Sequence, residues 1–150
     1  MGSLAEMLGD KADKLVRAAL NVGDVHILPL GKENNITPKD GQQTKDKFFV
    51  IPGFDTQGNI IGGVVINSKI NYNLPDTITD YYMPIKMSEC PFLRYNSFAD
   101  CSKLIVARRD KFGATTYRGE MPSERVDEIK QTLIGNPSID KELLNTYGIV

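Results

Sequence analysis

The sequence predicts one α+β domain in which a small barrel or strongly bent antiparallel sheet carries helices at both ends of the chain. The first observation is a β-hairpin pattern: two apolar runs at 48–53 and 60–68, rich in β-branched and aromatic residues, flank a turn segment containing Gly and Asn. The second is the amphipathic helical spacing near both ends. The third is the length of 150 residues, which suits a single domain that buries most of its apolar surface.

The chain begins with a predicted amphipathic helix inside residues 1–21. Ser3 followed by Glu6 has the spacing of a capping box. Apolar residues then recur near one face, namely Leu4, Met7, Leu8, Leu15 and Ala19. We expect this helix to pack on the outside of the sheet. The alternative is that it docks a partner or closes the sheet of a second subunit.

The first strand of the β-rich body (22–120) is predicted in residues 22–30. A period of two places Val25 and Ile27 on one side and Asp24 and His26 on the other. His26 is therefore expected to face solvent or the sheet edge. It is the only histidine, so a Ser-His-Asp triad or a multi-histidine zinc site is not expected.

Residues 31–47 form the most polar run of the chain and are predicted to be a long loop, because Gly, Pro, Asn and Asp interrupt any periodicity. Loops of this length are usually functional or mobile, and the alternative is a plain solvated loop. After the hairpin, residues 69–80 are polar and turn-rich. A strand is predicted in 81–87, where Pro84 favours a sheet edge or a bulge.

Two further strands and two helices complete the prediction. A strand is expected from about Ser97 to Ala107, and a short one within 115–121. Helices are expected in 121–150: Pro122 starts the first, whose apolar face holds Val126, Ile129 and Leu133. Ser138 is expected to cap a last short helix with the apolar residues Leu143, Leu144 and Tyr147.

Composition narrows the classes of function. The net charge of −1 gives no global electrostatic argument for nucleic-acid binding, so an RNA site would have to be a local basic patch. The apolar runs are too short to span a membrane and no secretory signal is visible, so a cytoplasmic location is expected. Cys90 and Cys101 lack metal or redox spacing, which favours a structural role in a reducing compartment.

The order of these elements resembles the MazF/PemK-like toxins of bacterial toxin–antitoxin systems over about residues 22–134. A Val-Gly-Asp-Val segment opens the first strand, and a Gly-Gln-Gln segment precedes the hairpin. The residues that carry the resemblance are 22–25, 41–43, Lys47, Ser68, 97–101, Leu104 and 119–121. No single motif among them is highly specific, but their order and spacing together are.

The resemblance implies an SH3-like small barrel that cleaves single-stranded RNA without a metal or other cofactor. In that chemistry the 2′-hydroxyl attacks its own phosphate and leaves a cyclic phosphate and a 5′-hydroxyl. The family's catalytic arginine and serine or threonine fall on Lys47 and Ser68. Lysine cannot form the bidentate fork of arginine, although it still supplies a point charge. The alternative is an ordinary strand-edge lysine and a turn serine. A homodimer and a neutralising antitoxin protein are also implied.

Hairpin geometry independently predicts a phosphate site, because Lys45 and Lys47 enter the hairpin where Ser68 and Lys69 leave it. Aromatic rings near this end are candidates to stack single-stranded bases, unless they are half-buried sheet residues. These rings are Tyr72, Tyr81 and Tyr82. Further candidates for contacts with the RNA backbone are Arg94, Arg108 and Arg109, for which a solvated surface charge is the alternative.

Three functional hypotheses remain open at this point. The first is the toxin-like endoribonuclease, with RNA and an antitoxin as partners and no membrane. The second is a non-catalytic barrel module that binds protein or nucleic acid and in which Lys47 marks a decayed site. The third is an accessory protein of a mobile element that makes its contacts through the N-terminal helix.

Overall fold

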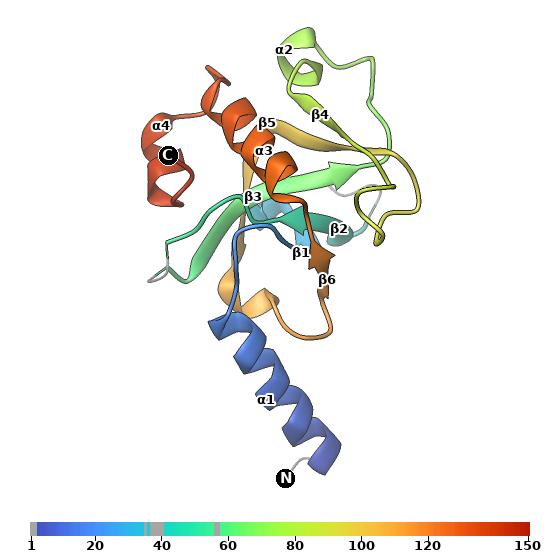
Figure 1. The fold of residues 1–150 in the computed structure, drawn as a ribbon, viewed down its shortest axis with the longest axis vertical. Helices are drawn as coiled ribbons and strands as arrows, with labels where there is room; N and C mark the ends of the chain where they lie inside the picture. The colour runs from blue at the N-terminus through green and yellow to red at the C-terminus, as the bar shows by residue number, and fades with distance from the viewer. Residues whose placement is uncertain (1–2, 35, 37–40, 56–57) are drawn as a thin grey trace.

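The computed structural model describes residues 3–34, 36, 41–55 and 58–150, and confirms the α+β class (Figure 1). Parts of the predicted polar loop and of the predicted hairpin turn, residues 35, 37–40 and 56–57, lie outside the described residues. The elements are α1 (Leu4–Ala18), β1 (Asp24–Gly31), the 3₁₀ turn η1 (Lys32–Asn34), β2 (Thr44–Val50), β3 (Ile60–Asn67), α2 (Asp76–Thr79), β4 (Tyr82–Ile85), β5 (Ser97–Arg108), the 3₁₀ turn η2 (Arg109–Lys111), β6 (Tyr117–Glu120), α3 (Ser123–Ile134) and α4 (Lys141–Thr146).

The strands form one six-stranded antiparallel sheet in the order β4-β5-β3-β2-β1-β6. The predicted hairpin is confirmed, because β2 and β3 pair with Phe48 opposite Ile66 and Val50 opposite Val64. β4 is an edge strand, as Pro84 predicts. The strand pairing leaves the sheet open, so the SH3-like barrel stays a prediction.

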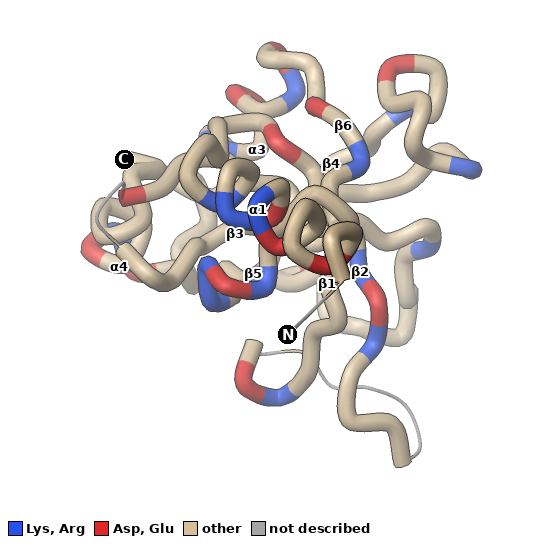
Figure 2. The backbone as a smooth tube through the Cα atoms, turned by 90° about the horizontal axis from the view of Figure 1, so that it is seen from below, with Lys and Arg blue, Asp and Glu red and all other residues tan. Residues whose placement is uncertain are grey.

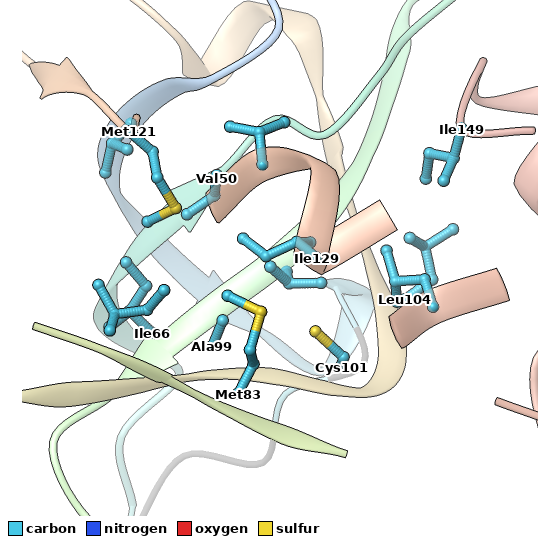
Figure 3. Close-up of a cluster of buried hydrophobic side chains, with 14 of the residues drawn as sticks. Val50, Ile66, Met83, Ala99, Cys101, Leu104, Met121, Ile129 and Ile149 are labelled. Carbon is cyan, nitrogen blue, oxygen red and sulfur yellow. The ribbon is translucent and has the colours of Figure 1, made fainter. Parts of the chain in front are cut away.

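Two apolar cores lie on opposite faces of this sheet. The larger core is covered by α3 and α4, whose buried Ile129, Leu133 and Leu144 meet the sheet side chains shown in Figure 3. The smaller core lies on the other face and includes Phe49 and Phe112. Adjacent residues of a strand point to opposite faces, so Phe49 enters the smaller core and Val50 the larger one.

Asn34, a buried residue of η1, bridges two strands that do not pair with each other. Its side-chain oxygen accepts from the Gly31 backbone N–H at 3.0 Å, and its side-chain nitrogen donates to the Val106 carbonyl at 2.8 Å. The Lys111 ammonium donates to the same oxygen at 3.3 Å and to the Pro29 carbonyl at 3.0 Å. We call these contacts the Asn34 bridge. They hold the end of β1 against β5, which requires a strongly bent sheet.

Glycines allow the C-terminal segment to pack closely against the sheet and the segment after β2. A Cβ on Gly62 would lie 2.7 Å from the ring of Tyr147, and one on Gly53 would lie 2.5 Å from the carbonyl oxygen of Gly148. Gly148 itself has φ +68°, a conformation that favours glycine. The turn after α4 therefore packs closely on the sheet and places Ile149 in the larger core.

Several boundaries differ from the sequence prediction. β2 begins at Thr44, so the predicted loop from 31 to 47 is shorter than expected and Lys45 and Lys47 belong to a strand. The short helix α2 was not predicted. Asp140, not Ser138, caps α4, because its side chain accepts from the Glu142 backbone N–H at 3.0 Å. Ser138 instead donates its backbone N–H to Asn136.

The cysteines fit the predicted structural role. Cys90 and Cys101 are both buried and free. Burial raises the pKa of the Cys101 thiol to about 12, so the thiol stays protonated at neutral pH. A protonated, buried thiol is a poor nucleophile, and Cys101 therefore acts as a small apolar side chain of the larger core.

Most of helix α1 does not pack on the outside of the sheet as predicted, and only its last turns contact the body, where Val16 packs against the smaller core. The predicted capping box between Ser3 and Glu6 is confirmed. The helix projects from the body of the protein, and none of its residues is buried (Figure 1). Hydrogen bonds of Asp13 and Arg17, in its last turns, fix the helix in this position. None of the described helices is long and apolar enough to cross a membrane.

Replacing Asn34 with alanine should destabilise the fold by about 2–3 kcal/mol, because the buried N–H of Gly31 and carbonyl of Val106 would lose their partner. Equilibrium unfolding in urea measures this change in free energy. Asn59→Ala is the matched control, because Asn59 is exposed and should change the free energy of unfolding by less than about 0.5 kcal/mol. Equal effects of the two substitutions would contradict a role of the bridge in stability.

Candidate functional site

The site begins with Lys47, whose position near the hairpin exit matches the sequence prediction. Its ammonium donates a hydrogen bond of 2.6 Å to the Asn67 side-chain oxygen. Lys47 lies opposite Asn67 because the β2–β3 register continues one step beyond the pair Phe48–Ile66. Ser68 follows Asn67 directly and is exposed. The structure thus brings Lys47 to the residue that precedes Ser68.

Tyr82 and Asp100 extend this arrangement toward the other edge of the sheet. Tyr82 pairs directly with Asp100 in the β4–β5 register. Its phenol lies close enough to the Asp100 and Asn67 side chains for both to influence its pKa. Burial, followed by the nearby Asp100 carboxylate, raises the pKa of Tyr82 to about 12, although Asn67 acts in the opposite direction. The phenol therefore keeps its proton at neutral pH.

We call Lys47, Asn67, Asp100 and Tyr82 the polar row. They come from four neighbouring strands, β2, β3, β5 and β4. They share the face of the smaller core, because Asp100 lies opposite Val65, and Lys47 follows the alternation that puts Phe49 in that core. The polar row therefore borders the smaller core where its apolar side chains end.

Asp100 is buried, and its carboxylate accepts hydrogen bonds from a residue of the same strand. The backbone N–H of Ser102 donates to its carboxylate at 3.0 Å, and the Ser102 hydroxyl donates to the same oxygen. The polar row thus holds a cation bonded to Asn67 on one side and a carboxylate beside Tyr82 on the other. A cation and a proton acceptor are the two kinds of group that phosphoryl chemistry without a metal requires.

Four predicted RNA-contacting residues lie near the same end of the sheet. Lys45 is two residues before Lys47 on β2 and therefore points to the same face. Lys69 and Tyr72 follow the end of β3, and Tyr72 is 84% exposed. Arg94 is exposed and lies shortly before Ser97, the first residue of β5. This end of the sheet therefore carries several cations and an exposed aromatic ring.

The structure does not bring Arg108 to the polar row. Arg108 lies opposite Ile60 at the start of β3, whereas Asn67 is at the end of that strand, about 23 Å away at roughly 3.3 Å per residue. Its guanidinium forms a surface ion pair with Asp110 at 3.3 Å. Arg109 lies next to it and binds the carbonyl oxygen of Arg17 at 3.0 Å, far from the proposed RNA path.

Sequence reasoning missed Asn67, Asp100 and the role of Tyr82. Tyr81 and Tyr82 were considered together as stacking residues, but Tyr81 packs against the larger core. A polar residue between two core positions of one strand was the available signal, since Asp100 separates Ala99 and Cys101. Phe98, half-buried and two residues before Asp100, is a further aromatic ring on the face of the polar row.

His26 was expected to face solvent or the sheet edge, and this is wrong. It is completely buried, with Phe112 and Tyr117 packed edge-on against its ring. Both faces of β1 are covered, so alternation could not reveal an exposed side. Nδ1 hydrogen-bonds to the Thr116 hydroxyl at 2.8 Å. Burial and the nearby Arg118 lower the pKa of His26 to about 4. His26 is thus a neutral core residue.

An open groove of about 480 Å³ lies elsewhere, between β6 and the start of α3. Glu120 and Asp127 give it two carboxylates, and its lining contains no lysine or arginine. This charge does not suit a phosphate ligand. Among the residues that the structure describes, no three His, Cys, Asp or Glu side chains are grouped to hold a metal ion.

Comparison with known protein families finds no family model that matches the chain, and comparison with curated proteins finds no significantly similar sequence.

The ring signals of the single histidine should titrate with a midpoint near pH 4 in the folded protein, well below the ordinary value of 6.5. The unfolded chain then binds more protons between these two values, so His26 should make the fold less stable as the pH falls from about 6.5 to 4. A pH series of NMR spectra measures the midpoint without interference from another histidine. A midpoint near 6.5 would mean that the imidazole is in contact with water.

Proposed function

We propose that the protein is a metal-independent endoribonuclease that cleaves single-stranded RNA at the polar row. The observation that carries the proposal is the Lys47 ammonium, held 2.6 Å from Asn67 beside the exposed Ser68. A cation fixed at the end of the hairpin suits a phosphate whose negative charge increases in the transition state. The resemblance to MazF/PemK-like toxins assigns the catalytic pair to Lys47 and Ser68.

In the proposed reaction the ribose 2′-oxygen forms a bond to the adjacent phosphorus, and the bond from phosphorus to the 5′-oxygen breaks. The 2′-hydroxyl loses its proton to Tyr82, which passes its own proton to the neighbouring Asp100 carboxylate. The departing 5′-oxygen takes a proton from a water molecule, and Asp100 then returns its proton to the hydroxide, so no oxidant, metal or water is consumed. Lys47 and the Ser68 hydroxyl stabilise the phosphate oxygens.

The RNA path of the proposal runs over the end of the sheet that carries Lys45, Lys69 and Arg94. These cations would bind successive phosphates, while exposed Tyr72 and half-buried Phe98 offer rings for base stacking. A local patch of this kind is compatible with the net charge of −1. The same proposal includes an antitoxin protein that covers this face, a homodimer and an SH3-like closure of the sheet.

The second candidate function is a non-catalytic module that binds protein or nucleic acid. One observation favours it: Lys47 and Asn67 are bonded to each other and Asp100 is bonded to Ser102, as in a purely structural network. In this case Lys47 and Tyr82 stabilise the sheet margin, and binding depends on the exposed residues around it.

Purified protein should cut a long single-stranded RNA at a few fixed positions in the presence of EDTA, and leave cyclic phosphate and 5′-hydroxyl ends. Lys47→Ala should reduce the rate at least about 100-fold, because it removes the charge that stabilises the transition state. Ser68→Ala and Tyr82→Phe should each slow cleavage, the latter without removing the buried ring. Gel analysis and end-group chemistry measure rate and product.

Lys45→Ala is the matched control, because Lys45 lies on the same strand and face but is exposed. It should weaken RNA binding by only a few fold and leave the cleavage rate at saturating RNA nearly unchanged. Cleavage that survives in Lys47→Ala and Ser68→Ala alike would place the active site elsewhere. If pure wild-type protein binds RNA but does not cleave it, the binding module is the correct function.

A further inference from the structure

Helix α1 exposes an apolar face that no other part of the described chain covers. Four large apolar side chains form it and are 59 to 73% exposed: Leu4, Met7, Leu8 and Leu15. At about 100° per residue these side chains lie within one sector about 100° wide. A surface helix normally turns such a sector toward the protein core, so its outward orientation indicates a binding partner.

The spacing on this face is that of a coiled-coil seam. The a and d positions of a heptad repeat, written a to g, are filled in turn by Leu4 (d), Leu8 (a), Lys11 (d), Leu15 (a) and Ala18 (d). We call these five residues the seam, and all of them are exposed. Steps of four and three residues alternate along it, which is the period of 3.5 that directs side chains toward a second helix. The pattern therefore fits another helix as the occupant.

The side of α1 that lies away from the seam attaches the helix to the body. The Asp13 carboxylate accepts from the Ala114 backbone N–H at 2.8 Å, and the Arg17 guanidinium donates to the Phe112 carbonyl at 3.2 Å. Val16 packs against the smaller core. These three helix residues occupy the f, c and b positions, which lie behind a coiled-coil seam. The attachments therefore leave the seam uncovered and hold the helix in place before a partner binds, which lowers the entropy cost of binding.

The charges at the seam are all positive. Lys11 lies in the middle of the seam, and Lys14 occupies a g position that flanks it. The three acids of the helix, Glu6, Asp10 and Asp13, occupy f and c positions on the opposite side. Figure 2, in which α1 is seen nearly end-on, shows both signs of charge on the helix. The surface offered to a partner is therefore apolar and basic, although the helix as a whole carries equal numbers of acids and bases.

We infer that the seam binds an acidic helix of a different protein, which carries one carboxylate opposite Lys11 and another opposite Lys14. A lysine in the core of a coiled coil is costly when its charge is unpaired, and it specifies the partner when it meets a carboxylate. A second copy of this chain would bring a second Lys11 and no acid to the seam. A bilayer is also a poor match, because Lys11 would point toward the hydrocarbon. No residue of the polar row belongs to the seam, so this binding does not depend on nuclease activity.

Titration calorimetry of the full chain with two synthetic helical peptides tests this binding. Both peptides contain three heptads with leucine at the a and d positions, except for one central d position. The acidic peptide carries glutamate at that position and at every e and g position, and the basic peptide carries lysine at the same places. Wild-type protein should bind the acidic peptide at least about tenfold more tightly, because only this peptide supplies carboxylates to Lys11 and Lys14.

Three variants separate the contribution of the seam from general charge attraction. Lys11→Glu should bind the acidic peptide more weakly than wild-type protein and the basic peptide at least about fivefold more tightly. A misfolded variant would not gain affinity, so loss of folding cannot imitate this result. Leu8→Gln should weaken binding of the acidic peptide at least about tenfold, because it removes an apolar contact while keeping a good helix former. Lys86→Glu is the matched control, because it makes the same charge change at an exposed lysine outside α1 and should leave both affinities unchanged.

Equal affinity of the wild-type protein for the two peptides would overturn the assigned partner chemistry. Equal effects of Lys11→Glu and Lys86→Glu would overturn the role of the seam. Failure to bind the acidic peptide at about 1 mM would also overturn the proposal, whether the chain then binds phosphatidylglycerol vesicles or a second copy through the same face.

Discussion

The Asn34 bridge is the interaction on which the shape of the sheet depends. Strand pairing alone gives an open sheet, in which β1 and β5 are not neighbours. Asn34 supplies both a donor and an acceptor in the gap between them, and Lys111 joins the same oxygen. Because these groups are satisfied inside the protein, the sheet can bend far enough to bury the smaller core between its own strands.

The polar row is a consequence of the same bend. Where the side chains on the inner face change from apolar to polar, Lys47, Asn67, Asp100 and Tyr82 lie side by side on four strands, and Lys47 is bonded to Asn67. A cation and a carboxylate thereby share one face of the sheet. This arrangement suits a reaction that moves a proton and stabilises a charge at the same time, and it also suits a stable sheet margin. The proposed nuclease and the proposed binding module differ only in whether RNA replaces part of this network.

Periodicity predicted the elements well and their surroundings poorly. The hairpin, β5 and α3 could be predicted because each has a long apolar pattern with clear boundaries. The predicted exposure of His26 was wrong because both faces of β1 are covered. Alternation tells which residues share a face of a strand, but not which face meets water. The apolar face of α1 predicted a helix but did not predict what lies against that face. The contact between Tyr82 and Asp100 was not predicted, because these residues become neighbours only through the β4–β5 register, which no local pattern encodes.

The close packing of Gly62 and Gly53 against the turn after α4 has a consequence for how the protein is made. Leu144 and Ile149 complete the larger core, so the segment up to Ile149 must have left the ribosome before that core can close. The sheet is synthesised before α4, and the sheet face that α3 and α4 cover stays exposed to other nascent chains and to chaperones during that interval. Closure of the larger core therefore waits for α4 and the turn after it, and conditions that slow translation of this segment should lower the yield of folded protein more than they lower its stability.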